Sequence, residues 1–220
     1  MDVDELLTST RSARKTLDLE AAVDLDEVGD CLRVALHAAN GTNNQSWRWI
    51  VVSDAEQRRP IAALYREAYE SMTGGGRVSD AIPADTDFGR LMSSTEWLVD
   101  HLAEVPLYVI PCYEPYLPRS DGDQLFYDAT LYGSIFPAVW NLQLALRARG
   151  YGSCITTLHL LRAKEVAALL GIPDRYVQGC LLPVGRLRVA GTRPTPRKTL
   201  AEVTALDRFD GHPLRAGTPA

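Results

Sequence analysis

Two hydrophobic periodicities alternate along the chain. Over residues 25–38 the apolar side chains recur every three or four positions, which predicts an amphipathic helix. Asp24 and Glu27 precede and begin this stretch in the arrangement of a capping box. Over residues 47–52, Trp47, Trp49 and Val51 alternate with the residues between them, which predicts a strand with at least one buried face. Helical and extended segments therefore follow each other closely.

The same two patterns account for most of the chain up to Gly185. Helical spacing predicts further helices over residues 3–9, from an N-cap at Asp54 to residue 72, and over residues 88–102, 128–149 and 162–170. Aliphatic runs predict strands over residues 105–113, 153–157 and 177–184. No repeat or low-complexity linker divides the chain. We therefore predict one α+β domain spanning residues 1–220.

Three segments stand apart from this regular pattern. The helix predicted over residues 128–149 is apolar on more than one face, which indicates burial in the core or at a subunit interface. Residues 74–87 and 114–124 are typical of flexible surface segments. Beyond about residue 188 the chain is too poor in apolar residues to form a core of its own. A subunit partner is one candidate surface for the large apolar residues of this tail, which are Leu200, Val203, Leu206 and Phe209.

Composition narrows the classes of function. With 46% hydrophobic and 23% charged residues the chain is expected to be soluble and globular, and no run approaches the ~20 apolar residues of a membrane span. Its first residues lack the order of a signal peptide, so the expected location is the cytoplasm. A net charge of -5 argues against nucleic acid as a partner. The four cysteines lack the spacing of metal or redox sites and are expected to be buried thiols, namely Cys31, Cys112, Cys154 and Cys180.

Several catalytic motifs are absent from the sequence. No Gly-x-Ser-x-Gly elbow occurs, which argues against a serine hydrolase. The histidines, His37, His101, His159 and His212, are scattered, so we expect packed or surface histidines and no metal site. No glycine-rich phosphate loop occurs either. Any bound phosphate must therefore be held by side chains.

Polar clusters in three places indicate a small ligand. Residues 38–47 carry amides, a glycine and a tryptophan at a helix-to-strand junction, and amides can match the edge of a planar heterocycle. The alternative is an ordinary turn. Arg11 and Arg14 lie three apart and could grip phosphate oxygens with forked guanidinium groups, the alternative being a solvated basic turn. A second basic run, Arg186 to Lys198, contains no acidic residue. Convergence of the two runs on one phosphate would suit a mononucleotide cofactor.

These clusters resemble the motifs of the nitroreductase family of flavin mononucleotide (FMN) oxidoreductases. Members carry an Arg-Ser-x-Arg motif, an Asn-x-Gln-Pro-Trp loop, a Gly-hydrophobic-Gly turn after a long helix, a strand ending in Pro-Val-Gly, and a basic Pro-Arg-basic motif. The order of the matches along nearly the whole chain is more specific than any one of them. The matching residues are Arg11, Ser12 and Arg14; Asn43, Gln45 and Trp47; Gly150 to Gly152; Pro183 to Gly185; and Pro196 to Lys198.

The resemblance implies a three-layer sandwich with a central mixed β-sheet flanked by helices. It also implies a homodimer with a C-terminal extension that wraps the partner, and two FMN sites at the interface, each built from both subunits. Arg11, Ser12, Arg14 and Arg197 would hold the phosphate and ribityl chain, and Asn43 and Gln45 would reach polar atoms of the ribityl chain and ring. The segment along the ring, near its reactive nitrogen, would be Ile155, Thr156, Thr157 and Leu158.

The chain departs from the family's pattern in places. Ser46 stands where proline is usual, Thr16 and Leu17 stand where an aromatic residue often follows the arginine motif, and Lys198 replaces a common second arginine. Thr156 to Leu158 occupy a stretch where some members place an acidic residue. These departures bear on the substrate more than on the cofactor.

The implied activity is a ping-pong cycle in which NADH or NADPH reduces FMN, and FMN then reduces an electron-poor acceptor such as a nitroaromatic or a quinone. No catalytic side chain is expected, because the cofactor carries the redox chemistry. Two alternatives remain open: a flavin enzyme that oxidises a biosynthetic intermediate, and a non-catalytic flavin-binding protein. Four aromatic residues are candidates either for shaping the acceptor pocket or for simple packing, namely Tyr113, Tyr116, Phe126 and Tyr127.

Overall fold

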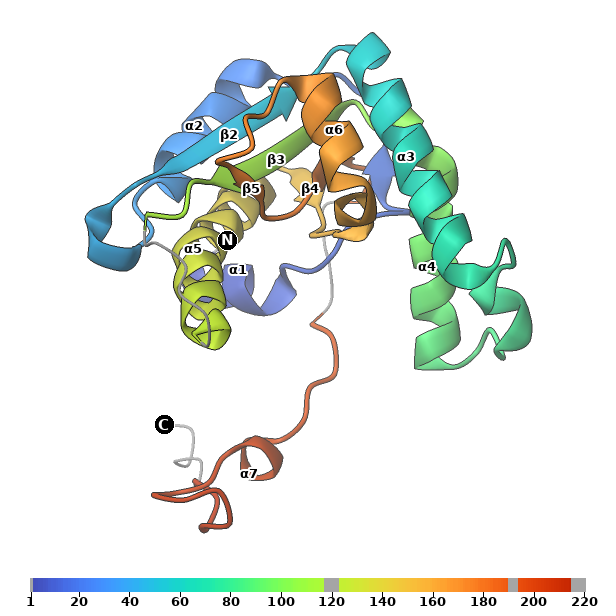
Figure 1. Cartoon of the computed structure of the whole chain (residues 1–220). Helices are drawn as coiled ribbons and strands as arrows, with labels where there is room; N and C mark the ends of the chain where they lie inside the picture. Colours follow the sequence, from blue (N-terminus) through green and yellow to red (C-terminus); the bar gives the residue numbers. More distant parts are fainter. Residues whose placement is uncertain (1, 117–122, 190–193, 215–220) are drawn as a thin grey trace.

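The protein is built in three layers, with a β-sheet between two groups of helices (Figure 1). The computed structural model describes residues 2–116, 123–189 and 194–214. The predicted α+β three-layer arrangement is confirmed. The α-helices are α1 (Val3–Ser9), α2 (Leu25–Ala35), α3 (Ala55–Thr73), α4 (Asp87–His101), α5 (Gln124–Ala148), α6 (Ala163–Leu170) and α7 (Leu200–Val203). The strands are β1 (Leu17–Asp18), β2 (Trp47–Val52), β3 (Leu107–Tyr113), β4 (Tyr151–Ser153), β5 (Val177–Gln178) and β6 (Leu182–Leu187). Short 3-10 turns are η1 (Gly41–Asn43), η2 (Val78–Ala81), η3 (Leu102–Glu104) and η4 (Leu158–Arg162).

β3 is the central strand of the sheet. It pairs with β2 on one edge, and with β5 and β6 on the other. β6 also pairs with β1 and β4. Every pairing in residues 2–116, 123–189 and 194–214 is antiparallel, which differs from the mixed sheet that we predicted. The reason is that the segment from β5 through β6 lies between β3 and β4 and runs opposite to both.

The side chains of β3 alternate between two cores, one on each face of the sheet. Tyr108, Ile110 and Cys112 pack with residues of α3, α4 and α6. Leu107 and Val109 pack with residues of α2 and α5 on the opposite face. The whole strand is buried, and burial of a large apolar side chain contributes roughly 1.5–3 kcal/mol. β3 therefore anchors both helical layers to one sheet.

Helix ends follow the predicted signals in most places. The Asp54 carboxylate accepts a hydrogen bond from the N–H of Glu56 at the start of α3. Gly74 and Gly171 end α3 and α6 in the left-handed conformation, with φ of 67° and 64°. Glycine adopts this conformation without a steric penalty, whereas other residues do not.

The start of α2 corrects one prediction. The Asp24 side chain caps the helix as expected, accepting from the N–H of Asp26 and of Glu27. The Glu27 carboxylate, however, does not complete a capping box. It accepts hydrogen bonds from the Tyr151 hydroxyl (2.5 Å) and from Arg186 (2.6 Å) instead. A charge-assisted bond to a guanidinium is stronger than one to a backbone N–H, which explains the different partner.

The strand predicted over residues 105–113 begins two residues later, at Leu107, and two other strands differ more from their predicted bounds. The strand expected over residues 153–157 begins earlier, at Tyr151, and only Thr156 continues the pairing beyond Ser153. The strand expected over residues 177–184 is divided into β5 and β6 and extends to Leu187. The division lies opposite Pro111, which accepts a hydrogen bond from the N–H of Gly179 (2.8 Å) but has no N–H to return.

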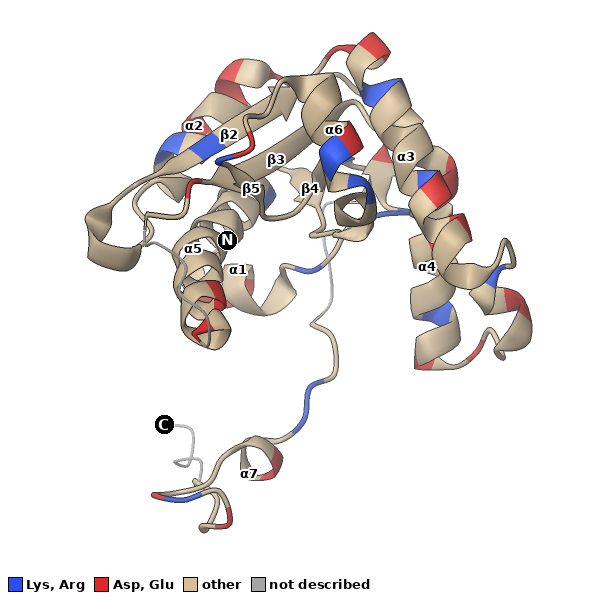
Figure 2. Cartoon of the chain, viewed as in Figure 1, with Lys and Arg blue, Asp and Glu red and all other residues tan. Residues whose placement is uncertain are grey.

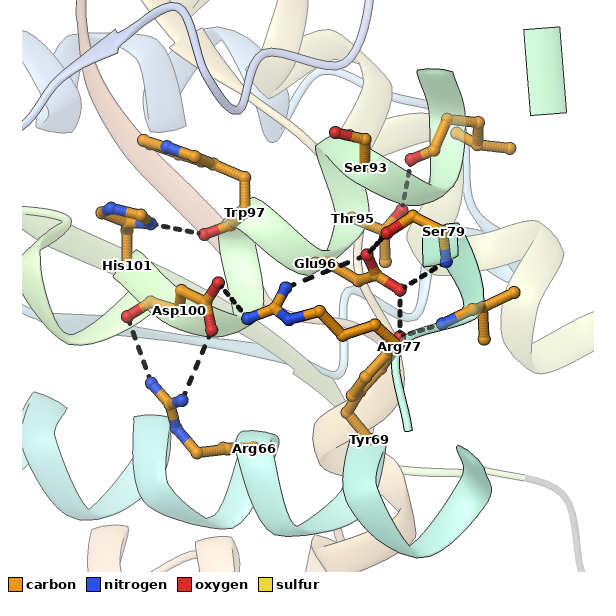
Figure 3. A network of polar contacts seen from close by, with 12 residues as sticks. Arg66, Tyr69, Arg77, Ser79, Ser93, Thr95, Glu96, Trp97, Asp100 and His101 are labelled. Atoms are coloured by element: carbon orange, nitrogen blue, oxygen red, sulfur yellow. Dashed lines mark hydrogen bonds and ion pairs between the residues drawn. The ribbon is translucent and has the colours of Figure 1, made fainter. Parts of the chain in front are cut away.

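Polar contacts join α3, α4 and the connection between them (Figure 3). The Glu96 carboxylate is 1% exposed and accepts hydrogen bonds from the Tyr69 hydroxyl (2.5 Å) and from the N–H (3.0 Å) and hydroxyl of Ser79. Arg77 forms an ion pair with Asp100 (2.6 Å). Burial by itself would raise the pKa of Glu96, but the hydrogen bonds outweigh it and hold the pKa below its ordinary value. The carboxylate therefore ties the connection to both helices.

The tail, residues 194–214, extends away from the three layers (Figure 1). Its hydrogen bonds in the described chain are all internal, as in the capping box between Thr199 and Glu202. Leu200, Val203, Leu206 and Phe209 are all exposed, and Phe209 is 104% exposed. None of the helices in residues 2–116, 123–189 and 194–214 combines the length and the apolar character that crossing a bilayer requires.

Candidate functional site

The basic loop, Arg11–Lys15, lies against β4. The N–H of Ala13 donates to the carbonyl of Ser153 (2.9 Å), so the loop follows the strand closely. Gly152 makes this approach possible, because a Cβ there would stand 2.7 Å from the Cβ of Ala13. Arg11 and Ser12 are exposed. A small pocket opens at this junction, lined by Thr10, Arg11, Ser12, Ala13, Thr16, Gln143, Arg147, Tyr151, Gly152, Ser153 and Leu187.

Two residues of this pocket were not among the predicted site residues. Gln143 and Arg147 lie four apart on α5, and both are buried, at 6% and 7% exposure. Gln143 donates to the hydroxyl of Ser153 (3.1 Å). A signal for them exists in the sequence, since they are large polar residues at helical spacing in an otherwise apolar stretch. Arg11 and Arg147 bring two guanidinium groups to one pocket, an arrangement that favours an anion.

Arg14 points toward the core more than Arg11 does. It is only partly exposed and contacts the thiol of Cys154. Burial raises the pKa of Cys154 to about 11, although the nearby Arg14 charge opposes that rise. Burial likewise raises the pKa of Tyr65 to about 12, with Arg14 again opposing it. Arg14 thus joins the basic loop to the chain that follows β4.

The segment Ile155–Leu158 continues directly from that strand. Thr156 exchanges two backbone hydrogen bonds with Leu181, at 3.0 and 2.9 Å, and its hydroxyl contacts the Tyr65 hydroxyl at 2.6 Å. Thr157 is exposed, whereas Ile155 and Leu158 are partly buried on the two cores. The structure therefore brings Arg11, Ser12 and Arg14 into one region with the predicted ring-side segment.

The amide loop, Asn40–Ser46, lies against the middle of α5. The N–H of Gly41 donates to the hydroxyl of Ser134 (3.0 Å), and a Cβ at Gly41 would stand 2.7 Å from the Tyr116 hydroxyl. Thr42, Asn43 and Gln45 all have φ between 52° and 53°, in the left-handed region. Non-glycine residues rarely adopt this conformation, and such strain gathers at functional sites.

Side-chain hydrogen bonds hold the amide loop in this strained form. The side-chain oxygen of Asn40 accepts from the backbone N–H of Gln45 (3.0 Å), and the side-chain amide of Gln45 donates to the side-chain oxygen of Asn43 (3.2 Å). The Ser46 hydroxyl donates to the carbonyl of Glu114 (2.6 Å). Asn43 and Gln45 nevertheless remain exposed, so their amides can also meet a ligand.

One chain does not bring the amide loop and the basic loop together. Ser134, which binds the amide loop, and Gln143, which lines the basic pocket, are nine residues apart on α5. At ~1.5 Å and ~100° per residue, they are separated by roughly 14 Å along the axis and lie on opposite faces of the helix. The two loops therefore flank α5 from different sides.

The C-terminal basic residues divide into different environments. Arg186 pairs with Glu27 and lies over the ring of Tyr151, 4.0 Å from its centroid, so it has a structural role. Arg197 is exposed on the tail and donates only to the adjacent carbonyl of Pro196 in the described chain. Figure 2 shows the basic part of the tail well separated from the basic segment between α1 and β1. Arg193 lies outside the described residues. Within one chain, Arg197 and Arg11 do not meet.

The four aromatic candidates also differ among themselves. Tyr113 is 1% exposed and belongs to the core under α2 and α5, so packing is its role. Tyr116 is partly buried and lies against Gly41 of the amide loop. Phe126 is 57% exposed and meets Tyr127 edge to face. Residues 117–122, between these two groups, lie outside the described chain.

Thiols and histidines contribute no metal centre in the part of the chain that the structure describes. Cys31, Cys112, Cys154 and Cys180 are buried free thiols, as predicted. His159 is fully buried, and desolvation lowers its pKa to about 4. Within residues 2–116, 123–189 and 194–214, no group of three or more histidine, cysteine, aspartate or glutamate residues is placed to hold a metal ion.

The fold and the pocket define a three-layer α+β protein with two arginines at one small pocket, and comparison with known proteins identifies the family. The chain belongs to the Nitroreductase family, whose model matches residues 7–186. It is 27% identical over 206 residues to the iodotyrosine deiodinase of Drosophila melanogaster, covering 90% of this chain and 67% of that protein.

Solved structures agree with this fold. A crystal structure of oxidised iodotyrosine deiodinase bound to FMN and 3-iodo-L-tyrosine superimposes with a TM-score of 0.71 at 21% identity, over 94% of this chain and 100% of the other. The FMN- and NADPH-dependent nitroreductase NfnB from Sphigopyxis sp. strain HMH gives a TM-score of 0.66 at 18% identity, over 95% and 100%. The predicted nitroreductase-like fold is thus confirmed.

Proposed function

We propose that this protein is an FMN-dependent oxidoreductase that uses NAD(P)H to reduce electron-poor organic acceptors. The observation that carries the proposal is a pocket lined by both Arg11 and the buried Arg147 in a chain of the Nitroreductase family. Two guanidinium groups and the hydroxyl of Ser12 are suited to a phosphate monoester. The residues present therefore fit the phosphate end of FMN.

We also propose that the working form is a homodimer with two shared sites. The opposite placement of the amide and basic loops on α5 supports this, because one FMN could use both loops only if different chains supplied them. α5 also exposes apolar side chains at Leu125, Tyr132 and Trp140, which favours a subunit contact. The exposed apolar residues of the tail, with Arg197 beside them, would dock on the partner.

When bound, FMN supplies the transfer of hydride or electrons between NAD(P)H and the acceptor. Arg11, Ser12, Arg14 and Arg197 would hold its phosphate and ribityl chain. Asn43 and Gln45 would donate to or accept from polar atoms of the ribityl chain and ring. Ile155, Thr156, Thr157 and Leu158 would lie beside the ring and orient it. No side chain is assigned a catalytic proton transfer.

The acceptor class has two candidates. Nitroaromatics and quinones follow from the family and from the likeness to NfnB. Reductive dehalogenation of an iodinated tyrosine is the second candidate, which the likeness to iodotyrosine deiodinases favours. Both reactions would use the same bound FMN, so they differ only in what occupies the acceptor pocket.

The test begins with the purified protein and added FMN. We expect a yellow complex whose visible band bleaches when NADH or NADPH is added without oxygen. Oxidation of the reduced protein by a nitroaromatic, a quinone or 3-iodotyrosine, each monitored by flavin absorbance, then identifies the acceptor. Iodide release in the last reaction would select dehalogenation. Colourless protein that takes up no FMN would refute the proposal.

A variant tests the phosphate pocket directly. Arg11→Ala should weaken FMN binding by about tenfold or more, since a charge-assisted contact is lost. Binding of riboflavin, which lacks the phosphate, should change little. Arg59→Ala removes an exposed arginine on α3 that is paired with Glu56, and serves as the matched control. Equal losses for FMN and riboflavin would contradict the role of Arg11.

A further inference from the structure

Tyr65 makes one hydrogen bond that its packing does not explain. It lies on α3, is fully buried, and fills the core beneath the sheet. A phenylalanine ring would fill that space equally well. The hydroxyl adds a contact to the Thr156 hydroxyl, with 2.6 Å between the two oxygens. Because burial makes an unpaired hydroxyl costly, this bond fixes both side chains.

Thr156 is thereby held at three points. Its N–H donates to the carbonyl of Leu181 (3.0 Å), its carbonyl accepts from the N–H of Leu181 (2.9 Å), and its side chain meets Tyr65. The next residue is different. Thr157 is exposed, and neither its N–H nor its hydroxyl has a hydrogen-bond partner in the described chain. A fixed residue therefore precedes one with two available donors.

The surroundings connect this pair to the basic loop. Arg14 lies close enough to act electrostatically on the Tyr65 hydroxyl, and it also contacts the Cys154 thiol. Cys154 itself is two residues before Thr156 in the chain. Tyr65 thus connects α3, which lies outside the predicted site, to the segment Ile155–Leu158, which is predicted to lie along the flavin ring.

We propose that Tyr65 is a positioning residue, whose hydroxyl orients Thr156 so that the N–H and hydroxyl of Thr157 face the flavin ring. This rests on the proposed FMN site. Tyr65 itself does not touch the cofactor, and it acts through the two threonines. Its role differs from that of the residues in the family motifs, because it comes from a helix that carries none of them.

The chain offers a matched control. Tyr108 is also fully buried in the same core and donates its hydroxyl to the carbonyl of Leu102, away from the 155–158 segment. Tyr65→Phe and Tyr108→Phe each remove one buried hydroxyl that is hydrogen-bonded. A general loss of stability should therefore be similar in both, and an effect on the flavin should appear only in Tyr65→Phe.

The experiment uses the full-length holoprotein. In Tyr65→Phe we expect FMN binding weakened about two- to tenfold, as one hydrogen bond would cause, together with a shifted visible absorption band of the bound flavin. Tyr108→Phe should leave both unchanged. Thr156→Val should reproduce the Tyr65→Phe spectrum, whereas Thr156→Ser, which keeps the hydroxyl, should show the native one. The double variant Tyr65→Phe/Thr156→Val should have the same FMN affinity and spectrum as either single variant.

The outcomes separate this inference from the proposed function. If wild-type protein binds no FMN, the proposed function fails first. If wild-type protein binds FMN and Tyr65→Phe has the native affinity and spectrum, the positioning role is overturned while the FMN site stands. Equal changes in Tyr65→Phe and Tyr108→Phe would also overturn it, because they would reflect a loss of core packing alone.

Discussion

The close approach of the basic loop to β4 depends on the absence of a side chain at Gly152. A Cβ there would stand 2.5 Å from a methyl group of Leu187, 2.7 Å from the Cβ of Ala13 and 2.9 Å from a methyl group of Leu17. The leucine methyl groups are at the ends of flexible side chains, but the Cβ of Ala13 moves only with its backbone. Gly152→Ala should therefore displace the loop from the strand.

The expected cost follows from these contacts. Forcing one methyl group into a packed interior typically costs about 1–3 kcal/mol. For a chain of this size, each 1 kcal/mol lowers the melting temperature by roughly 2–4 °C. The hydrogen bond from the N–H of Ala13 to the carbonyl of Ser153 is the contact that a displacement of the loop would lengthen first. We expect the variant to fold with a lower urea midpoint. Its affinity for FMN should fall more than its affinity for riboflavin, which lacks the phosphate.

Gly29→Ala is the matched control for this prediction. Gly29 lies inside α2, and a Cβ there meets nothing within 4 Å. Alanine in a helix interior is more favourable than glycine by about 1 kcal/mol, so this variant should be more stable than wild type. Urea denaturation of both variants measures the difference. If Gly152→Ala were as stable as wild type, the steric reasoning at β4 would be refuted.

Other predictions concern acid stability and the tail. Burial lowers the pKa of His159 from 6.5 to about 4, so between these pH values the unfolded chain is protonated at this histidine while the folded chain is not. The free energy of unfolding should therefore fall by about 3 kcal/mol from pH 6.5 to pH 4. His159→Leu should flatten that decline in urea titrations. The pKa of Glu96 is lowered, so the ionised carboxylate contributes to the free energy of unfolding above pH 4.5, and this contribution is lost as the pH falls further. Glu96→Gln should lower the urea midpoint at pH 7, and the difference from wild type should shrink in acid. Removal of residues 190–220 should leave the unfolding midpoint of the isolated subunit unchanged, because the described tail bonds only to itself, but should abolish dimers in light scattering.

Local patterns predicted the order of helices and strands because most elements have one buried face. β2 and α1 agree with their predicted bounds, and Asp54 caps α3 as its position suggested. β4 was misplaced because Gly150 and Gly152 were interpreted as helix-ending residues. Gly150 does have a φ of +81° after α5, but Gly152 lies inside the strand, where its lack of a side chain admits the basic loop. Such a requirement comes from distant residues and is not visible locally.

The candidate site was predictable only in part, for a similar reason. Arg11, Ser12 and Arg14 were found because they form a motif, and the structure assembles them with the 155–158 segment. Arg147 was missed although it stands four residues from Gln143 in an apolar helix, because only the tertiary fold shows that this face of the helix lies at the basic loop. Arg186 belongs to the predicted basic run but pairs with Glu27, whose position beside it depends on the sheet.

The placement of the two loops on opposite faces of α5 has a genetic consequence. If each site takes its basic loop from one chain and its amide loop from the other, two variants whose own dimers bind FMN too weakly to be active at limiting FMN can rescue each other. A chain with Arg11→Ala still has an unaltered amide loop, and a chain with Asn43→Ala still has an unaltered basic loop. When the two are unfolded together and reassembled at random, about half the dimers are mixed and each contains one intact site, so about a quarter of the native activity should return. Such complementation would show that α5 separates the two halves of each site, so that each half comes from a different chain.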